Sequence, residues 1–254
     1  MRGGAIPRAR AAWPWWLAGG AAACALVALA ALCCPPTFRA AARMLTDELG
    51  PVENATWLCF LGGAVVAATV ALAARRRRER STAAGYAGVA VCCALAAMEE
   101  ISWGQAFFTW TTPPAWFALN AQGETNLHNL EPLQDLSSFA VLLVTLAALA
   151  LAWAGTRGRL RRFAVPAGLA PLLGLVAVMA AGETVNDFTF VPQPAAEIIG
   201  TLSELAELYV AVACLGYAWL NRRMLRRDWA AADAARDAHA DVPATIDARE
   251  RRAA

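Results

Sequence analysis

Apolar residues gather in six long runs along the chain, each close to the roughly 20 residues that a helix needs to cross the hydrocarbon core of a bilayer. The runs are rich in Ala, Leu, Val and Gly and do not alternate between apolar and polar positions, which favours helices over strands. The sequence therefore predicts an all-α polytopic membrane helical bundle with six transmembrane helices. The predicted spans are residues 13–34, 55–74, 82–98, 137–154, 163–182 and 205–220.

Charge is distributed unequally between the connections of these spans. All 22 basic residues are arginines, and 20 of them fall on one side of the predicted membrane. Cytoplasmic segments keep such an excess of basic residues, so both termini are predicted to be cytoplasmic in a bacterial inner membrane. The chain then divides into a cytoplasmic N-terminus at 1–12, a membrane domain at 13–220 with an outer loop at 99–136, and a cytoplasmic tail at 221–254, rich in Arg, Ala and Asp.

The composition agrees with this class, because 59% of the residues are hydrophobic and 17% charged, whereas a soluble domain averages about 45–50% and 25%. The lipid bilayer is the predicted surrounding, and no nucleic acid is expected as a partner. A cleaved signal peptide is the alternative for residues 13–34, but that run exceeds the roughly 7–15 apolar residues of a signal core. The tail is expected to start as a helix from Trp229 and to be mobile later.

Two polar motifs on the predicted outer side mark the candidate site. Residues 99–105 (EEISWGQ) follow the third run directly, and residues 122–130 (QGETNLHNL) follow about two dozen residues later. Ionisable groups at the rim of an apolar span are costly to keep there and suggest a functional site. The candidate catalytic residues are Glu99, Glu100 and His128, and the candidate substrate-binding residues are Ser102, Trp103, Gln105, Gln122, Glu124, Asn126 and Asn129.

Three sets of polar residues have helical spacing near the outer ends of the spans. If the third helix continues past Met98, Glu99 shares a face with Ser102, and Glu100 shares one with Trp103 and Gly104. The other sets are Glu183, Asn186 and Asp187, and Glu197, Thr201, Glu204 and Glu207. All three sets are expected to converge at the outer membrane interface, where Glu100, His128, Glu183, Asp187 and Glu204 are the candidate ligands of a divalent metal ion.

The segment between the two motifs is aromatic. Its rings flank Pro113-Pro114, which stops a helix, and they are expected to form a lid or floor over the polar groups. The rings belong to Phe107, Phe108, Trp110, Trp116 and Phe117. The alternate positions Glu124, Asn126 and His128 are polar, as expected of an extended strip that points them in one direction.

One histidine among several carboxylates allows three interpretations. The first is a metal site with a bound water as nucleophile. The second is a metal-free pair, in which Glu99 or Glu100 activates water and His128 donates a proton. The third is a polar network that locks the helices together.

The two motifs resemble signatures of a family of bacterial polytopic membrane proteins of uncharacterised activity. The likeness covers mainly residues 98–135 and the layout of spans, and it implies no particular reaction. The Glu-Glu pair is also weakly similar to that of the glutamic intramembrane proteases of the CAAX-prenyl-protease and bacteriocin-processing type. That similarity implies that Glu99 and Glu100 activate water with the help of His128, although Gly104 replaces the arginine of that pattern and its second membrane histidine is absent.

The first functional hypothesis is a membrane-embedded hydrolase or transferase that acts at the outer leaflet on a lipid-linked or peptide substrate. The second is a non-enzymatic protein that binds or transports a cation or another small molecule in the same acidic site. The third is a structural membrane subunit. The sequence leaves the oligomeric state open.

Overall fold

The computed structural model describes residues 36–38, 40, 42, 50–108, 110–120, 123–154 and 158–240. Within these residues the regular structure is helical, and an isolated bridge between Asn120 and Leu130 is the single β feature. The predicted all-helical class is therefore confirmed. The predicted first span at 13–34 and the Gln122 site residue lie outside the described residues.

Five of the described helices are long and apolar enough to cross a membrane, and they correspond to the second to sixth predicted spans. They are α3 (Pro51–Arg76), α4 (Arg80–Glu100), α7 (Glu131–Ala154), α8 (Ala170–Phe188) and α9 (Gln193–Ala240). Short helical segments connect them: η1 (Ser102–Gly104), α5 (Gln105–Phe108), α6 (Pro114–Phe117), η2 (Gly158–Phe163) and η3 (Ala167–Leu169).

Local chemistry sets the limits of α3. Pro51 occupies the first turn, where its missing N–H costs nothing and its fixed φ suits a helix. Glu53 lies in the first turn, whereas Arg75 and Arg76 lie in the last, so each charge opposes the partial charge of the nearer helix end. The apolar run between them is long enough to cross a membrane.

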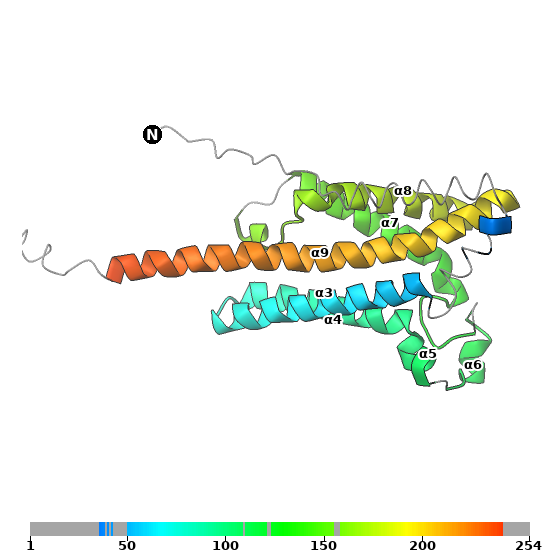
Figure 1. Cartoon of the computed structure of the whole chain (residues 1–254), viewed down its shortest axis with the longest axis horizontal. Coiled ribbons are helices and arrows are strands. Elements are labelled where there is room, and N and C mark those ends of the chain that lie inside the picture. The colour runs from blue at the N-terminus through cyan, green and yellow to red at the C-terminus, as the bar shows by residue number, and fades with distance from the viewer. Residues whose placement is uncertain are drawn as a thin grey trace, which may run out of the picture.

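Helix α9 is the centre of the bundle (Figure 1). On one side of α9, α3 packs against both α9 and α4. On the other side, α8 packs against both α9 and α7. The bundle therefore consists of two helical hairpins joined through one helix. With 48 residues α9 is about 72 Å long, more than twice the thickness of a hydrocarbon core.

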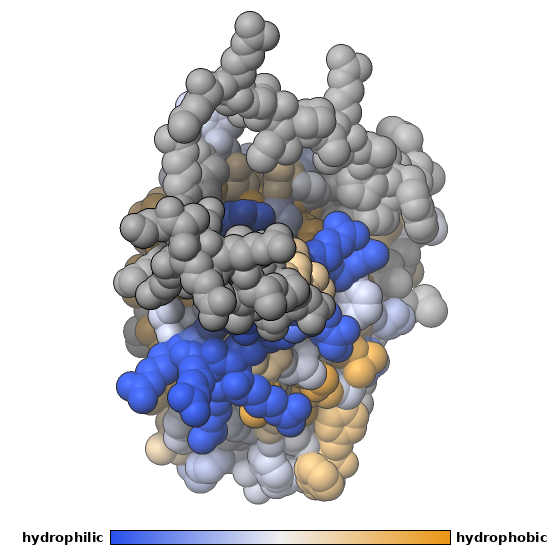
Figure 2. All heavy atoms as spheres, turned by 90° about the vertical axis from the view of Figure 1, so that its left-hand side faces the viewer, coloured by the Kyte–Doolittle hydropathy of each residue, from blue (hydrophilic) through white to orange (hydrophobic). Residues whose placement is uncertain are grey.

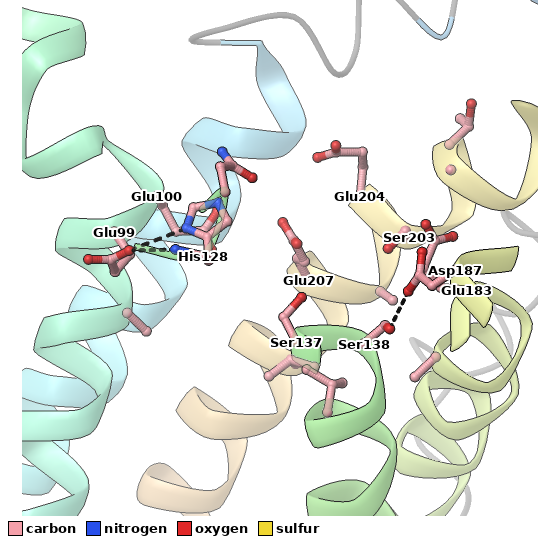
Figure 3. A pocket seen from close by; sticks show the side chains of 18 of the residues that line it. Glu99, Glu100, His128, Ser137, Ser138, Glu183, Asp187, Ser203, Glu204 and Glu207 are labelled. Carbon is pink, nitrogen blue, oxygen red and sulfur yellow. Dashed lines mark hydrogen bonds and ion pairs between the residues drawn. The ribbon is translucent and has the colours of Figure 1, made fainter. Parts of the chain in front are cut away.

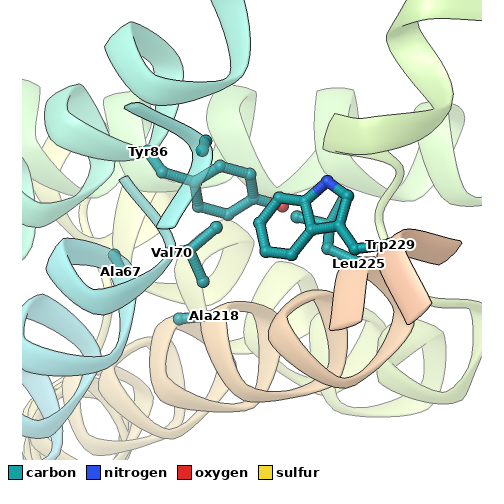
Figure 4. Packing of buried hydrophobic residues seen from close by; sticks show 7 residues of the cluster. Ala67, Val70, Tyr86, Ala218, Leu225 and Trp229 are labelled. Atoms are coloured by element: carbon teal, nitrogen blue, oxygen red, sulfur yellow. The ribbon is translucent and has the colours of Figure 1, made fainter. Parts of the chain in front are cut away.

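Small residues let α3 approach α9 closely. A Cβ placed on Gly63 would lie 3.4 Å from the backbone nitrogen of Leu215, which is already van der Waals contact, so the α9 backbone leaves no space there for a side chain larger than that of alanine. Farther along, Tyr86 of α4 packs with Val70 of α3 and with Leu225 and Trp229 of α9, and all four side chains are buried (Figure 4).

The end of the bundle where α3 ends and α4 begins is the arginine-rich end. There Arg77 forms a two-pronged ion pair with Asp233, at 2.5 and 3.0 Å, and Glu79 accepts hydrogen bonds from Arg162 and from the indole of Trp229. These contacts hold α9 to the α3–α4 connection well beyond residue 220. The tail therefore begins as an unbroken continuation of α9.

Candidate functional site

A cavity of about 630 Å³ lies at the opposite end of the bundle, between α4, α7, α8 and α9 (Figure 3). We call it the acidic cavity. The described residues that line it include seven carboxylates and one imidazole, that of His128, but no arginine. The carboxylates are Glu99, Glu100, Glu183, Asp187, Glu197, Glu204 and Glu207.

The carboxylates of the three polar sets with helical spacing thus converge on one space, whereas Ser102, Trp103 and Asn186 of those sets do not line it. Glu99 and Glu100 come from α4, Glu183 and Asp187 from α8, and the remaining carboxylates from α9. Asn129 joins them from the loop. Apolar side chains of Phe60, Val141 and Val210 complete part of the wall.

Glu99 holds the second motif against the end of α4. Its Oε1 accepts a hydrogen bond from the indole of Trp103 at 2.6 Å. Its Oε2 accepts the backbone N–H groups of Leu127, at 2.6 Å, and of His128, at 3.2 Å, and also lies 3.4 Å from the Nδ1 atom of His128. Both oxygens are occupied, so Glu99 is placed to position the loop and the imidazole.

The imidazole of His128 lies beside Glu99, and both line the acidic cavity. Burial lowers the pKa of His128 below its usual value, while the Glu99 carboxylate acts in the opposite direction. The ring is therefore neutral at pH 7. Since Glu99 is an acceptor, the neutral ring is assigned its proton on Nδ1, which leaves Nε2 free to accept a proton.

Most of the predicted substrate-binding residues are bonded to the loop itself. The Ser102 hydroxyl donates to Glu124 at 2.5 Å, and the Asn126 amide donates to Ser102 at 3.1 Å and to Glu124 at 2.7 Å. Gln105 accepts the backbone N–H of Thr125 at 2.9 Å. Ser102, Trp103, Gln105, Glu124 and Asn126 do not line the acidic cavity, and their polar contacts give the loop its shape.

Two local expectations about these motifs are wrong. The third predicted helix does not continue past the carboxylates, because α4 ends at Glu100 and the backbone turns left-handed at Ser102, Trp103 and Gly104, with φ of 46°, 58° and 94°. Such residues cannot continue a right-handed helix. Residues 123–130 form bends and turns rather than an extended strip, so Glu124 and Asn126 bond to each other while His128 reaches Glu99.

The aromatic segment does not cover the polar groups as expected. Phe107, Phe108, Trp110 and Phe117 are exposed, and none of these four side chains lines the acidic cavity. Phe108 stacks on Trp110, and Phe107 meets Trp57 of α3 edge-on. The segment, with α5 and α6, lies beside the end of the α3–α4 hairpin (Figure 1). Its rings pack with one another and with α3 because the turn at Trp103 directs the chain that way.

Three serine hydroxyl groups in the wall were not predicted, whereas Thr201 belongs to one of the predicted sets. Ser137, Ser138, Thr201 and Ser203 line the acidic cavity, and Ser138 donates a 2.5 Å hydrogen bond to Asp187. The signal was present, because Ser137-Ser138 is a polar pair at the outer end of an apolar run, in the same position as the Glu-Glu pair. Ser138 is directed toward Asp187 of α8, within the α7–α8 hairpin (Figure 3).

The candidate metal ligands share the cavity but not a coordination sphere. Glu100 and His128 lie on one side of it, and Glu183, Asp187 and Glu204 lie on the other (Figure 3). Among the described residues, no three His, Cys, Asp or Glu side chains are spaced to hold a metal ion. Glu100 belongs to the α3–α4 hairpin, Glu183 and Asp187 belong to the α7–α8 hairpin, and Glu204 lies on α9, which joins the two hairpins.

Comparisons of the chain with protein-family models, with curated proteins and with solved structures found no match. The resemblances carried by residues 99–105 and 124–129 therefore stay predictions. The charge and geometry of the acidic cavity are the observations that bear on function.

Proposed function

We propose that this chain is an integral membrane protein that binds a cationic ligand in the acidic cavity. The observation that carries the proposal is the lining itself: seven carboxylates line one cavity, and no arginine among the described residues lines it with them. Carboxylates gathered in a half-buried site repel one another, and a cation between them removes that repulsion. A cavity walled by one sign of charge also raises the local concentration of the opposite ion.

The size and the mixed lining favour an organic cation. At about 630 Å³ the cavity lies in the range of about 300–1,000 Å³ that is usual for small-molecule sites. Phe60, Val141 and Val210 offer contact to an apolar body. The Oε2 atom of Glu183 is buried and accepts no hydrogen bond from the described residues, so an ammonium group could supply a donor. Amines and basic peptide side chains have this combination of features.

The distribution of the arginines favours a ligand site outside the cell. The acidic cavity lies at the end of the bundle opposite Arg77 and Arg162. Because basic residues are kept on the cytoplasmic side, the cavity is proposed to open toward the outer face of a bacterial inner membrane.

A second candidate is a membrane-embedded hydrolase or transferase that acts on a peptide or lipid-linked substrate. It is favoured by the Glu99–His128 pair, in which a carboxylate orients an imidazole whose Nε2 atom is free. His128 would take a proton from an attacking water and return it to the leaving group. Of the two substrate classes, a basic peptide fits the charge of the cavity better.

Thermal denaturation of the detergent-purified chain tests the first proposal. Lysine amide is expected to raise the midpoint of unfolding, whereas acetyl-norleucine amide, which is neutral, and succinate, an anion, are expected not to. Without ligand, Glu183→Gln is expected to stabilise the protein, because it removes one of the clustered negative charges. It is also expected to reduce the shift caused by lysine amide.

The exposed carboxylate of Asp237, at the arginine-rich end, gives the control variant Asp237→Asn. That change should leave the ligand response as in the wild type. Equal stabilisation by the neutral amide would contradict the proposal. A Glu183→Gln variant that unfolds more easily and still responds fully would favour a purely structural network instead.

A further inference from the structure

The α3–α4 connection contains arginines of two kinds. Arg77 is paired with Asp233 and also lies over the ring of Trp229, 5.2 Å from its centre. By contrast, Arg75, Arg78 and Arg80 are exposed, and within the described residues none of the three has an ion pair or a side-chain hydrogen bond. Arg76 is likewise exposed and has no ion pair among the described residues. Structural pairing therefore accounts for Arg77 and leaves the guanidinium groups of Arg75, Arg78 and Arg80 available.

The backbone of the connection gathers these three groups on one side. The N–H of Arg78 donates to the carbonyl of Arg75, at 3.0 Å, and the N–H of Arg80 donates to the carbonyl of Arg78, at 3.1 Å. Arg78 itself has a φ of 60°, a left-handed conformation that favours glycine. The turn thus places an arginine where the backbone alone would favour a residue without a side chain.

A hollow of about 430 Å³ lies on that side, and we call it the arginine hollow. Its lining consists of Arg75, Arg78, Arg80 and Ala83, so guanidinium groups supply all of its charge. Hydrophilic residues gather on this end of the molecule (Figure 2). An anion in the hollow would meet three positive charges and no acidic lining residue.

We propose that the arginine hollow binds the phosphate headgroup of an anionic membrane lipid. Guanidinium groups form two parallel hydrogen bonds to phosphate oxygens, which suits a phosphodiester better than a halide or a single carboxylate. The hollow lies where α3 ends and α4 begins, and both helices are of membrane-spanning length, so it stands at the level of the headgroups. The phosphate group of a membrane lipid would therefore lie next to the arginine hollow.

This site is independent of the acidic cavity, which lies at the other end of the same helices. Binding here would fix the depth of the α3–α4 hairpin in the bilayer. Each arginine near an anionic surface contributes about 1 kcal/mol, which corresponds to about a fivefold change in affinity.

Native mass spectrometry of the full chain in detergent tests the proposal, with dioleoylphosphatidylglycerol as the anionic probe and dioleoylphosphatidylcholine as the zwitterionic one. The wild type is expected to bind the anionic lipid more tightly by at least about tenfold. The triple variant Arg75→Gln, Arg78→Gln, Arg80→Gln is expected to lose most of that preference, a change on the order of tenfold or more.

The matched control removes the same charge from the same end of the molecule, with Arg223→Gln, Arg226→Gln and Arg227→Gln. These three arginines are exposed on α9 and do not line the arginine hollow. The control is expected to retain the preference within about threefold, because the three substituted arginines of α9 do not line the arginine hollow. Equal losses in both triple variants would overturn the proposal, since net charge alone would then explain the binding.

A single variant separates binding from folding. Arg78→Gly removes one guanidinium group and suits the left-handed backbone, so it is expected to fold at least as well as the wild type and to bind the anionic lipid about fivefold less tightly. Unchanged lipid preference in Arg78→Gly would overturn the assignment of this residue. Displacement of the lipid by glycerol phosphate at similar concentration would show that a soluble phosphate is the ligand and would overturn the assignment to a lipid.

Discussion

Replacing Glu99 by alanine would release the second motif from the end of α4. Three N–H donors lose their acceptor: the indole of Trp103 and the backbone groups of Leu127 and His128. A buried hydrogen bond to a charged acceptor contributes about 1.5–3 kcal/mol to stability. The Glu99 side chain is 17% exposed, and its hydrogen bonds to Trp103 and Leu127 are exposed to solvent. We therefore expect each of the three bonds to contribute about 1 kcal/mol. The expected cost of opening the loop is about 2–3 kcal/mol.

Hydrogen exchange at the Leu127 and His128 amides measures this cost directly. A loss of about 2–3 kcal/mol corresponds to exchange that is roughly 30 to 150 times faster, while amides in the middle of α9 should be unaffected. Trp103→Phe removes one of the three bonds and should give about a third of the effect. Acceleration below about threefold in Glu99→Ala would refute the view that this carboxylate positions the loop and the His128 imidazole.

Three further predictions follow from described contacts. The folded-state pKa of His128 lies below its unfolded value near 6.5, so the unfolded chain binds the proton first as the pH falls. The free energy of unfolding should therefore decrease below about pH 6.5, and thermal scans should show a weaker decrease in His128→Gln. An equal dependence of the unfolding midpoint on pH in the two proteins would contradict this. Glu79→Ala should lower the unfolding midpoint by an amount equivalent to about 1–3 kcal/mol, because Arg162 and the indole of Trp229 both lose the Glu79 carboxylate, which is 22% exposed, as their acceptor. Asp233→Asn, at an exposed ion pair, should cost less than about 1 kcal/mol. Equal shifts in the two variants would argue against a greater contribution of Glu79 to stability. A Cβ on Gly85 would lie 2.3 Å from the ring of Phe163, so Gly85→Ala should destabilise the protein by about 1–3 kcal/mol. A Cβ on Gly88 would meet nothing within 4 Å, so Gly88→Ala should be neutral or stabilising in the same assay. A larger loss of stability in Gly88→Ala than in Gly85→Ala would contradict this packing.

The sequence predicted the helices and the meeting of the carboxylates because both depend on simple periodicity. An apolar run of about 20 residues predicts a membrane-length helix, and polar residues at the ends of several such helices on one side of a membrane must lie near one another. Glu183, Asp187 and Glu204 are brought together for this reason.

The shape of the loop could not be predicted in the same way. No periodic signal marks two consecutive left-handed residues, Ser102 and Trp103, and the main partners of Glu99 lie 28 and 29 positions away along the chain. The separation of the two halves of the cavity depends on how α9 joins the hairpins, which is a property of packing. The hydroxyl pair at Ser137 and Ser138 could not be recognised as part of the site from the sequence, because serine is common at the ends of helices.

Isothermal titration calorimetry of lysine amide into the wild-type chain and into Glu183→Gln tests the central claim most directly. The account predicts saturable binding to the wild type and a loss of affinity of at least about tenfold in Glu183→Gln, because one charge-assisted hydrogen bond contributes about 1.5–3 kcal/mol, which corresponds to roughly 10- to 150-fold. Asp237→Asn should bind as the wild type does. No binding to a monodisperse wild type, or equal binding by Glu183→Gln, would contradict the claim that the acidic cavity holds a cation.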